Sequence, residues 1–302
     1  MKILKHRVLV TGAYGLLGSN LLQTLSEDYE RSGMELMLRS DFALPGIEYI
    51  EGDLTDRSRI IEICKAFQPN LIFNAAAYTN VDKSETEREV CWNVNVDGVA
   101  NLAYAAKLID ARVIHVSTDY VFDGTKKTPY KETDRVDPQG FYARSKLAGE
   151  NALIASGVDY AIARTMILYG YSPGARLNFA TWVIEQLQNG KPIRIVDDQI
   201  GQPTLASELA EALVKLARSG NQGIYHICGK EAMSRYDFTI EIAKMFGLDV
   251  SLIQRIKTAE LNQPAPRPMH SVFDLSKLES ELDVKMSTVR EGLQKLKASY
   301  PI

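Results

Sequence analysis

The sequence predicts an α/β protein in which a doubly wound, mostly parallel sheet carries a smaller C-terminal lobe. Two patterns lead to this fold class. Short apolar runs alternate with helical segments through the first half of the chain, which is the order that builds a parallel sheet covered by helices on both faces. A glycine-rich turn at Thr11–Gly18, T-G-A-Y-G-L-L-G, follows the first apolar run. This order of strand, turn and helix is typical of a Rossmann-type nucleotide-binding unit.

The composition is that of an ordinary globular protein. The 302-residue chain is 45% hydrophobic and 24% charged, with a net charge of -3. This charge gives no basic surface for nucleic acid or for an anionic membrane. The first apolar run is too short for a signal peptide, and no run approaches the roughly 20 residues of a membrane span. We therefore expect a cytoplasmic protein with no nucleic acid or membrane partner.

The cysteines and histidines form no recognisable metal or disulfide pattern. The three cysteines are far apart, and the four histidines lack spacings such as H-E-x-x-H. We expect no catalytic metal and three reduced thiols that pack in the interior, at Cys64, Cys91 and Cys228.

The elements can be placed in order from their apolar patterns and end signals. The first strand is predicted at Arg7–Val10 and the first helix at Leu16–Leu25. Later strands are predicted at Glu35–Leu38, Ile47–Ile50, Leu71–Phe73, Val113–Val116, Tyr160–Ala163, Ile193–Val196 and Gly223–Ile227. Later helices are predicted at Arg57–Phe67, Glu85–Lys107, Tyr142–Ala155, Asn178–Asn189, Ser207–Ala217, Ser234–Gly247 and Ser287–Ala298. We expect residues 1–165 to form the nucleotide-binding domain, with a return segment near 196–220, and residues 166–302 to form mainly the substrate lobe.

The glycine-rich turn suits a dinucleotide. Gly12, Gly15 and Gly18 permit a tight turn, close approach of the backbone to a pyrophosphate, and close packing of the helix on the strand. The N-terminus of the following helix attracts the anion.

The end of the second strand indicates which nicotinamide cofactor is bound. An acidic residue there would bind the 2′-hydroxyl of NAD, whereas a basic residue accommodates the 2′-phosphate of NADP. Arg39 and Ser40 follow the predicted strand and suit a phosphate, while Asp41 favours NAD. We predict NADP(H) as the preferred cofactor, with NAD(H) as the alternative.

A tyrosine and a lysine form the candidate acid/base pair. Tyr142 and Lys146 are four residues apart on a predicted helix, so both side chains point to one face. A nearby ammonium favours the phenolate and lowers the pKa of a phenol from about 10. Thr118, at the end of the Val113–Val116 strand, would hydrogen-bond the oxygen of a carbonyl that Tyr142 protonates. Alone, Y-x-x-x-K more often marks a solvated helix face; the glycine-rich turn favours the catalytic interpretation.

Five strings together make the chain resemble the dTDP-4-dehydrorhamnose reductase family, within the extended short-chain dehydrogenase/reductase superfamily. They are the glycine-rich turn, N-A-A-A-Y-T-N-V-D-K-S-E at Asn74–Glu85, S-T-D-Y-V-F-D-G at Ser117–Gly124, V-D-D-Q-I-G-Q-P-T at Val196–Thr204, and A-P-R-P at Ala265–Pro268. The resemblance implies reduction of a 4-keto-6-deoxy sugar nucleotide, with Thr118, Tyr142 and Lys146 as the catalytic residues and Asn95 bracing the site.

The resemblance also implies two sets of binding residues. Those for the cofactor are Gly12, Tyr14, Gly15, Leu16, Leu17, Arg39, Ser40, Asp53, Leu54, Ala75, Ala76, Ala77, Tyr142 and Lys146. Those for the nucleotide-sugar substrate are Thr118, Asp119, Tyr120, Asn178 and Arg267. A homodimer is also expected.

One string departs from the family pattern. The rhamnose-forming enzymes typically have a tryptophan in a string like R-T-S-W-V-Y, whereas this chain has Met166 and Ile167. An aliphatic side chain does not stack on a sugar in the same way. Two alternatives therefore stay open: another sugar-nucleotide reductase or epimerase, and a non-catalytic NADP-binding subunit like the regulatory subunit of methionine adenosyltransferase, which has a similar I-L-Y-G string.

Overall fold

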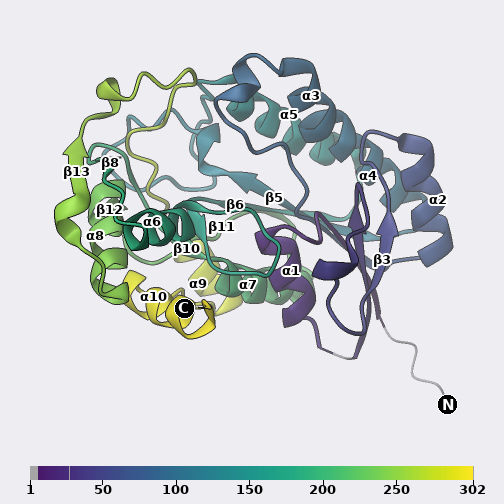
Figure 1. Cartoon of the computed structure of the whole chain (residues 1–302). Helices are drawn as coiled ribbons and strands as arrows, with labels where there is room; N and C mark the ends of the chain where they lie inside the picture. The colour runs from purple at the N-terminus through teal and green to yellow at the C-terminus, as the bar shows by residue number, and fades with distance from the viewer. Residues whose placement is uncertain (1–5, 27, 302) are drawn as a thin grey trace.

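A seven-stranded parallel sheet forms the centre of the protein (Figure 1). The computed structural model describes residues 6–26 and 28–301. The strand order is β11-β6-β5-β4-β1-β2-β3, and the strands are β1 (His6–Thr11), β2 (Tyr29–Glu35), β3 (Glu48–Glu51), β4 (Leu71–Asn74), β5 (Arg112–Thr118), β6 (Tyr160–Thr165) and β11 (Gly223–His226). The order reverses between β1 and β4, which is where doubly wound sheets bind ligands. The predicted fold class is confirmed.

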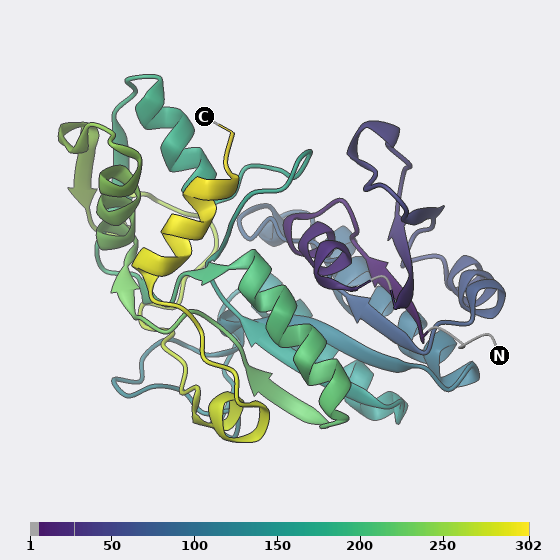
Figure 2. The same ribbon diagram turned by 90° about the horizontal axis from the view of Figure 1, so that it is seen from below.

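Helices cover both faces of this sheet. On the face toward the viewer in Figure 2 lie α1 (Leu16–Thr24), α7 (Ala206–Ser219) and α9 (Ser276–Leu282). On the opposite face lie α2 (Arg57–Phe67), α4 (Gly98–Leu108) and α5 (Phe141–Ser156). Along β1, Val8 and Val10 pack under α1 and α7 while Leu9 packs under α2 and α4. Because both faces of the strand are buried, it is a continuous apolar run.

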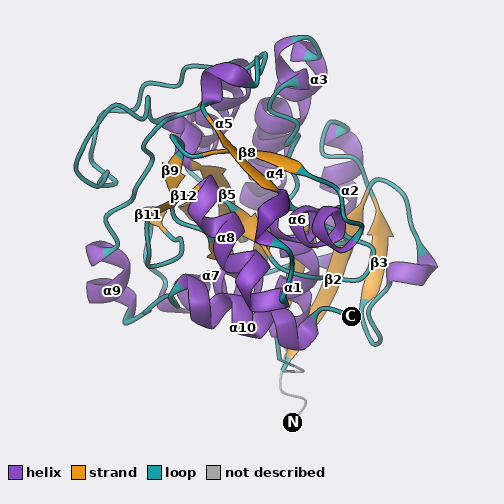
Figure 3. Ribbon diagram, turned by 60° about the vertical axis from the view of Figure 1, so that its left-hand side comes forward, coloured by secondary structure: helices purple, strands orange, loops and turns teal. Residues whose placement is uncertain are grey.

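The second lobe is built from late segments (Figure 3). It contains α6 (Phe179–Gln188), α8 (Arg235–Phe246) and α10 (Val289–Ser299), with β8 (Ile193–Val196) parallel to β13 (Ile253–Ile256). Its own apolar core includes Val183, Phe238 and Leu293, each fully buried. Two further short pairs are separate from the large sheet: β7 (Leu168–Tyr169) with β10 (Thr204–Leu205), and β9 (Ile200–Gly201) with β12 (Met233–Ser234).

The chain crosses back to the large sheet after entering the second lobe. Helix α7 packs against α1, and β11 extends the sheet by pairing with β6. The segment near 196–220 that was predicted to return to the first domain thus includes α7. Strand β11, which also returns to the sheet, follows this segment in the sequence. The domain division itself stays a prediction.

Two predicted elements differ from the structure. The second strand, predicted at Glu35–Leu38, is Tyr29–Glu35; the following Leu36 and Met37 are 66% and 65% exposed. The single helix predicted at Glu85–Lys107 is instead α3 (Arg88–Trp92), a π-helical turn (Asn93–Asp97) and α4. Such π-helical turns are frequently found at functional sites.

No helix within residues 6–26 and 28–301 has the length and hydrophobicity needed to cross a membrane.

Candidate active site

The predicted catalytic residues come together at the end of β5 and the start of α5. Thr118 is the last residue of β5, and Tyr142 and Lys146 lie one turn apart in the first part of α5. Thr118 is 7% exposed and Lys146 is 2% exposed, while Tyr142 is partly exposed. The Tyr120 ring packs edge-on against the Tyr142 ring at a centroid distance of 5.6 Å.

Burial shifts the two members of the pair in opposite directions. It raises the pKa of the Tyr142 phenol, aided by Tyr120 and opposed by a hydrogen bond with Thr118. It lowers the pKa of Lys146 to about 8. The Lys146 ammonium donates to the Val116 carbonyl at 2.8 Å. The expected lowering of the Tyr142 pKa by Lys146 is therefore not what this structure shows: the phenol keeps its proton at neutral pH, as an acid requires.

The Thr118 hydroxyl forms hydrogen bonds with the two residues that follow it. Its hydroxyl donates to the Asp119 carboxylate at 3.0 Å and accepts from the Tyr120 backbone at 3.2 Å. Ser271, from a loop before α9, donates to the other oxygen of Asp119 at 2.6 Å. Burial raises the pKa of Asp119. The predicted substrate residues Asp119 and Tyr120 thus lie directly beside the predicted catalytic residues.

Asn95 supports this arrangement from the π-helical turn. Its amide accepts from the Tyr78 N–H at 2.9 Å and donates to the Tyr78 carbonyl at 3.1 Å and to Ser145 Oγ at 3.0 Å. Ser145 Oγ in turn donates to the Tyr142 carbonyl at 2.7 Å. Asn95 therefore links the loop after β4 to α5.

The glycine turn lies against the loop after β4. Gly12 has a φ of +67°, and a Cβ there would lie 2.9 Å from Ala76 Cα. A Cβ on Gly18 would lie 2.1 Å from the Gly12 carbonyl oxygen. Helix α1 starts after Gly15 with no side-chain cap, so its first N–H groups are free of side-chain partners. This backbone cradle fits a pyrophosphate.

The other predicted cofactor residues line the same edge. Ala75, Ala76 and Ala77 follow β4 and are partly exposed, as is Leu16 at the start of α1, whereas Leu17 is buried in the core. Asp53 after β3 accepts from the Thr55 N–H at 2.8 Å. The Leu54 side chain is 5% exposed. For Leu17, only the backbone therefore suits a ligand contact.

The correction to β2 changes the basis of the cofactor prediction. The strand ends at Glu35, which is acidic, but its carboxylate accepts from the Tyr14 N–H at 2.5 Å. The Tyr14 hydroxyl accepts from the Arg39 N–H at 3.2 Å. The Arg39 guanidinium stacks on Phe42 at 4.1 Å. Both an acidic and a basic side chain thus lie near the glycine turn; the side chain of Ser40 lies outside the described part of the structure.

Two predicted substrate residues have partners within the protein. Asn178 caps α6 by accepting from Thr181 N–H at 3.3 Å, and it donates to the Gly170 carbonyl at 2.8 Å. Both polar ends of the amide thus have a partner within the protein, so Asn178 acts as a helix cap, and its contact with the substrate stays a prediction. Arg267 donates to the Ala265 carbonyl at 2.7 Å and pairs with Asp82 at 2.9 Å. Arg267 therefore contributes charge near Tyr120 but holds its own loop.

Arg235, which the sequence analysis missed, lies in the cleft between the lobes. It is the first residue of α8, and a small pocket shared with Asp119, Tyr120 and Ile167 includes it. Its guanidinium stacks over Phe179 at 5.1 Å and makes no hydrogen bond within the described residues. The available signal was its place directly after the Ser234 cap, at the cleft end of a helix.

Met166 and Ile167, where the sequence departs from the family pattern, lie in different surroundings: Met166 in the core and Ile167 in the cleft. Met166 is 3% exposed and accepts from the Gln202 N–H at 3.1 Å. Ile167 lines the cleft pocket with a φ of +44°. This conformation is strained for a β-branched residue, and such strain is concentrated at functional sites.

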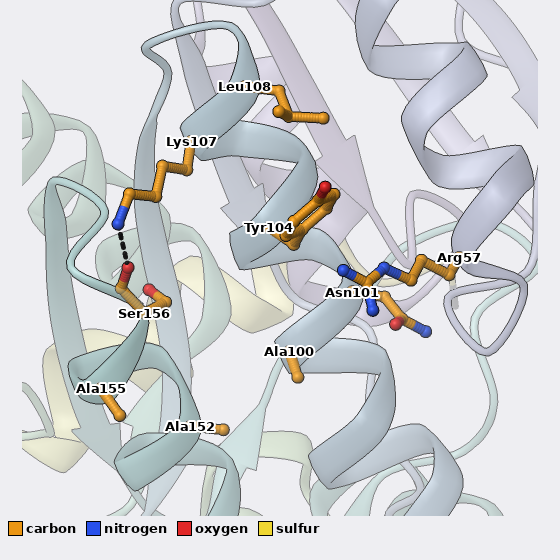
Figure 4. Close-up of a pocket in the computed structure, with 9 residues that line it drawn as sticks. All are labelled: Arg57, Ala100, Asn101, Tyr104, Lys107, Leu108, Ala152, Ala155 and Ser156. Atoms are coloured by element: carbon orange, nitrogen blue, oxygen red, sulfur yellow. Dashed lines mark hydrogen bonds between the residues drawn. The ribbon is translucent and has the colours of Figure 1, made fainter.

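A second hollow lies away from this cleft, between α4 and α5 on the outer surface (Figure 4). It measures about 650 Å³ and is mostly apolar. Arg57 stacks on Tyr104 at 3.9 Å at one side, and Lys107 donates to the Ser156 carbonyl at 2.7 Å at the other.

The described residues contain no cluster of metal-binding side chains. The three cysteines, Cys64, Cys91 and Cys228, are buried free thiols.

Comparison with known proteins identifies the family. The family described as the RmlD substrate binding domain matches residues 6–301. A dTDP-4-dehydrorhamnose reductase of Aggregatibacter actinomycetemcomitans is 36% identical, over 97% of this chain and 98% of the relative. The chain belongs to the dTDP-4-dehydrorhamnose reductase family.

Other members show the range of this reductase family. A probable low-salt glycan biosynthesis reductase of Haloferax volcanii is 34% identical, over 96% of this chain and 97% of the relative. The crystal structure of dTDP-4-dehydrorhamnose reductase from Bacillus anthracis in complex with NADP matches with a TM-score of 0.89 and 30% identity. That match covers 98% of this chain and all of the other, so both lobes share the family architecture.

Proposed function

We propose that this protein is an NADPH-dependent reductase that converts dTDP-4-dehydrorhamnose to dTDP-L-rhamnose. The observation that carries the proposal is the meeting of Thr118, Tyr142 and Lys146 at the same sheet edge as the glycine turn, in a chain of this reductase family. The name of the Aggregatibacter relative supports the substrate.

The cofactor proposal rests on the backbone cradle and on Arg39. Gly12 and the uncapped start of α1 would hold the pyrophosphate, and Arg39 would hold a 2′-phosphate. The bonding of Glu35 to Tyr14 supports this choice, because that carboxylate already has a partner. The NADP complex of the Bacillus anthracis relative supports it as well. NADP(H) is therefore proposed as the preferred cofactor and NAD(H) as the alternative.

The chain's own residues manage the proton. The reduced nicotinamide supplies a hydride to the carbonyl carbon when bound. The Thr118 hydroxyl, which donates to Asp119 without substrate, turns to donate to the carbonyl oxygen, and Tyr142 gives its proton to that oxygen as negative charge develops. Its raised pKa ensures that the proton is present at neutral pH. Lys146 lies one turn away and stabilises the phenolate left behind.

The cleft supports an anionic sugar-nucleotide substrate. The Arg235 guanidinium faces the cleft beside Tyr120, where a diphosphate would accept paired hydrogen bonds. Asp119 and Tyr120 would contact the sugar. Ile167 provides an apolar contact of the kind that suits the methyl group of a 6-deoxy sugar.

A second candidate within the same chemistry is a reductase or epimerase for another sugar nucleotide. The observation that favours it is Ile167, an aliphatic side chain in the cleft where the family typically has a tryptophan. The catalytic constellation is common to both candidates, so only a substrate panel separates them.

The test is loss of nicotinamide absorbance when purified protein meets NADPH and dTDP-4-dehydrorhamnose, with NADH and other 4-keto sugar nucleotides in parallel. The proposal expects the fastest turnover with NADPH and dTDP-4-dehydrorhamnose. Faster turnover of another sugar nucleotide would favour the second candidate. Tight NADPH binding with no turnover on any substrate would favour a regulatory, non-catalytic subunit.

A homodimer and a cytoplasmic location are also proposed. Tyr104, Leu108 and Ile154 leave 42%, 50% and 40% of their surface exposed on α4 and α5, and exposed apolar surface of this kind is often covered by another subunit. Sedimentation of the purified protein would show a mass twice that of the chain, and a Leu108→Glu variant would show the mass of one chain. Fractionation of cells that express the protein tests the location.

A further inference from the structure

A row of buried polar side chains connects the glycine turn to Lys146. It crosses three neighbouring strands at one level, since Thr11 is the register partner of Asn74 and Asn74 that of His115. Thr11 Oγ1 lies 2.7 Å from Asn74 Oδ1, and Asn74 Nδ2 lies 3.1 Å from His115 Nδ1. His115 Nε2 then lies 3.5 Å from Lys146 Nζ. Lys146 is the most exposed of the four, at 2%.

The first link fixes the direction of the hydrogen bonds. The Ala76 backbone N–H donates to Thr11 Oγ1 at 3.2 Å, and the Thr11 hydroxyl donates to the Asn74 carbonyl oxygen. The Asn74 amide nitrogen, which has only protons to offer, then donates to His115 Nδ1. A neutral imidazole that accepts at Nδ1 has its proton on Nε2. His115 is neutral, because burial and the charge of Lys146 lower its pKa well below the usual value.

The Nε2–H group therefore faces Lys146 Nζ. An ammonium has three donors and no lone pair, so the charged form of Lys146 meets another donor, whereas the neutral amine could accept from His115. We infer that the row of Thr11 and Asn74 holds His115 in its Nε2–H tautomer, and that His115, as a positioning residue, adds to burial in favouring the neutral form of Lys146. This inference rests on the proposed role of Lys146.

Burial is the main cause of the lowered pKa of Lys146, and the charged groups that act on this side chain oppose it. Glu150 and Cys91 both favour its charged form, and burial opposes them. The charge of Glu150 is already paired, since its two oxygens accept from Arg164 at 3.0 Å and 2.6 Å. Tyr142 on the same helix is neutral. Burial and the His115 donor thus act in the same direction, toward the neutral amine.

The consequence for the reaction concerns the proton on Tyr142. When Tyr142 gives its proton to the substrate oxygen, a phenolate forms. The Lys146 ammonium first stabilises this phenolate; if it then supplies the proton that restores the phenol, His115 donates a hydrogen bond to the neutral amine that is left. Solvent returns the proton to Lys146 before the next turnover, so charge and protons balance.

The test uses NMR of the full-length protein and needs no activity. With ¹⁵N-labelled histidine, the expected result for His115 is a protonated Nε2 and an unprotonated Nδ1 that accepts a hydrogen bond. A protonated Nδ1, or a charged imidazolium at neutral pH, would overturn the inference. This measurement needs no variant, and its outcome is independent of whether the proposed substrate is turned over.

The second measurement is the titration of the Lys146 side chain in a Thr11→Val variant, with Thr11→Ser as the matched control. Valine keeps the shape but removes the hydroxyl that orients Asn74, so the amide can invert and His115 can accept from the ammonium. The Lys146 midpoint should then rise by about one pH unit, whereas in Thr11→Ser it should stay at the wild-type value. Two results for a folded Thr11→Val protein would overturn the inference. One is a His115 tautomer that is the same as in the wild type. The other is a switched tautomer with an unchanged Lys146 midpoint.

Discussion

Tyr142 and Lys146 lie one turn apart on α5, and burial moves their pKa values in opposite directions, upward for the phenol and down to about 8 for the ammonium. The phenol thus holds its proton firmly, while the lysine can lose its proton near neutral pH. This division suits a reductase, in which one group gives a proton to the product and the other compensates the charge left behind.

Replacing Tyr142 with Phe should remove the acid and leave the backbone cradle unchanged. We expect turnover to fall by about 10²–10⁴-fold, with the dissociation constant of NADPH nearly constant. Steady-state kinetics and fluorescence titration of NADPH measure the two quantities. Tyr104→Phe, on the outer surface of α4, is the matched control and should retain full activity. Comparable turnover in the two variants would show that Tyr142 is not the acid.

The pH dependence of kcat/KM should report Lys146. Its pKa is lowered to about 8 in the folded protein, so the ammonium is present below this pH and is lost as pH rises through it. If the ammonium is the active form, kcat/KM falls on the alkaline side with a midpoint near 8. Lys146→Arg keeps its charge, so it should have lower activity but no alkaline decline near this pH. If kcat/KM of Lys146→Arg fell at the same pH, the decline would belong to a group other than Lys146.

Arg235 should bind the substrate's anionic part. Replacing it with Leu removes paired hydrogen bonds to a diphosphate, and we expect KM for the sugar nucleotide to rise by about 10–100-fold. The dissociation constant of NADPH should remain unchanged. Arg194→Leu removes an arginine that is 50% exposed in the same lobe, and it should leave KM unchanged. Equal KM values for the two variants would remove Arg235 from the substrate site.

Gly12→Ala should disrupt the cofactor site by a clash at the backbone. The added Cβ would lie 2.9 Å from Ala76 Cα, in a residue with φ of +67°. Gly190→Ala is a matched control, because its φ is +64° but no atom lies within 4 Å of the added Cβ. Backbone strain should cost each variant about 1 kcal/mol of stability, and the clash should destabilise Gly12→Ala further, as measured by denaturant unfolding. Only Gly12→Ala should lose NADPH binding.

Arg39 should contribute to the choice of cofactor. Arg39→Ala removes the guanidinium proposed to hold the 2′-phosphate, so the dissociation constant of NADPH should rise about tenfold and that of NADH should stay the same. An equal change for both cofactors would mean that Arg39 supports the loop through Phe42 and does not recognise the phosphate.

The sequence predicted the parts of the structure that depend on local pattern. The apolar runs of β1, β4 and β5 and the glycine turn are visible without coordinates. In contrast, β2 buries polar and small residues. Ser32 is satisfied by its hydrogen bond to the Glu48 carbonyl, and Gly33 has no room for a side chain, because a Cβ there would lie 2.7 Å from the Tyr49 ring. Nothing in the local pattern shows that such a strand is buried, while the apolar Leu36 and Met37 that follow are exposed.

The site residues that were missed depend on contacts between distant segments. His115 contacts Asn74 and Lys146 only because the register of β4 and β5 places it beside Asn74, with its ring next to the Lys146 side chain. Arg235 reaches the cleft because α8 of the second lobe starts opposite Asp119. The part of Asn178 as the cap of α6 likewise follows from its contacts with Gly170 and Thr181.

The most direct test of the central claim follows a labelled hydride. The protein is incubated with dTDP-4-dehydrorhamnose and NADPH that carries deuterium at the transferred position, and the product is examined by NMR and mass spectrometry. We expect dTDP-L-rhamnose with deuterium at C4 of the sugar, formed at least a hundredfold more slowly by Tyr142→Phe. A product without deuterium at C4, or equal rates for the two proteins, would contradict it.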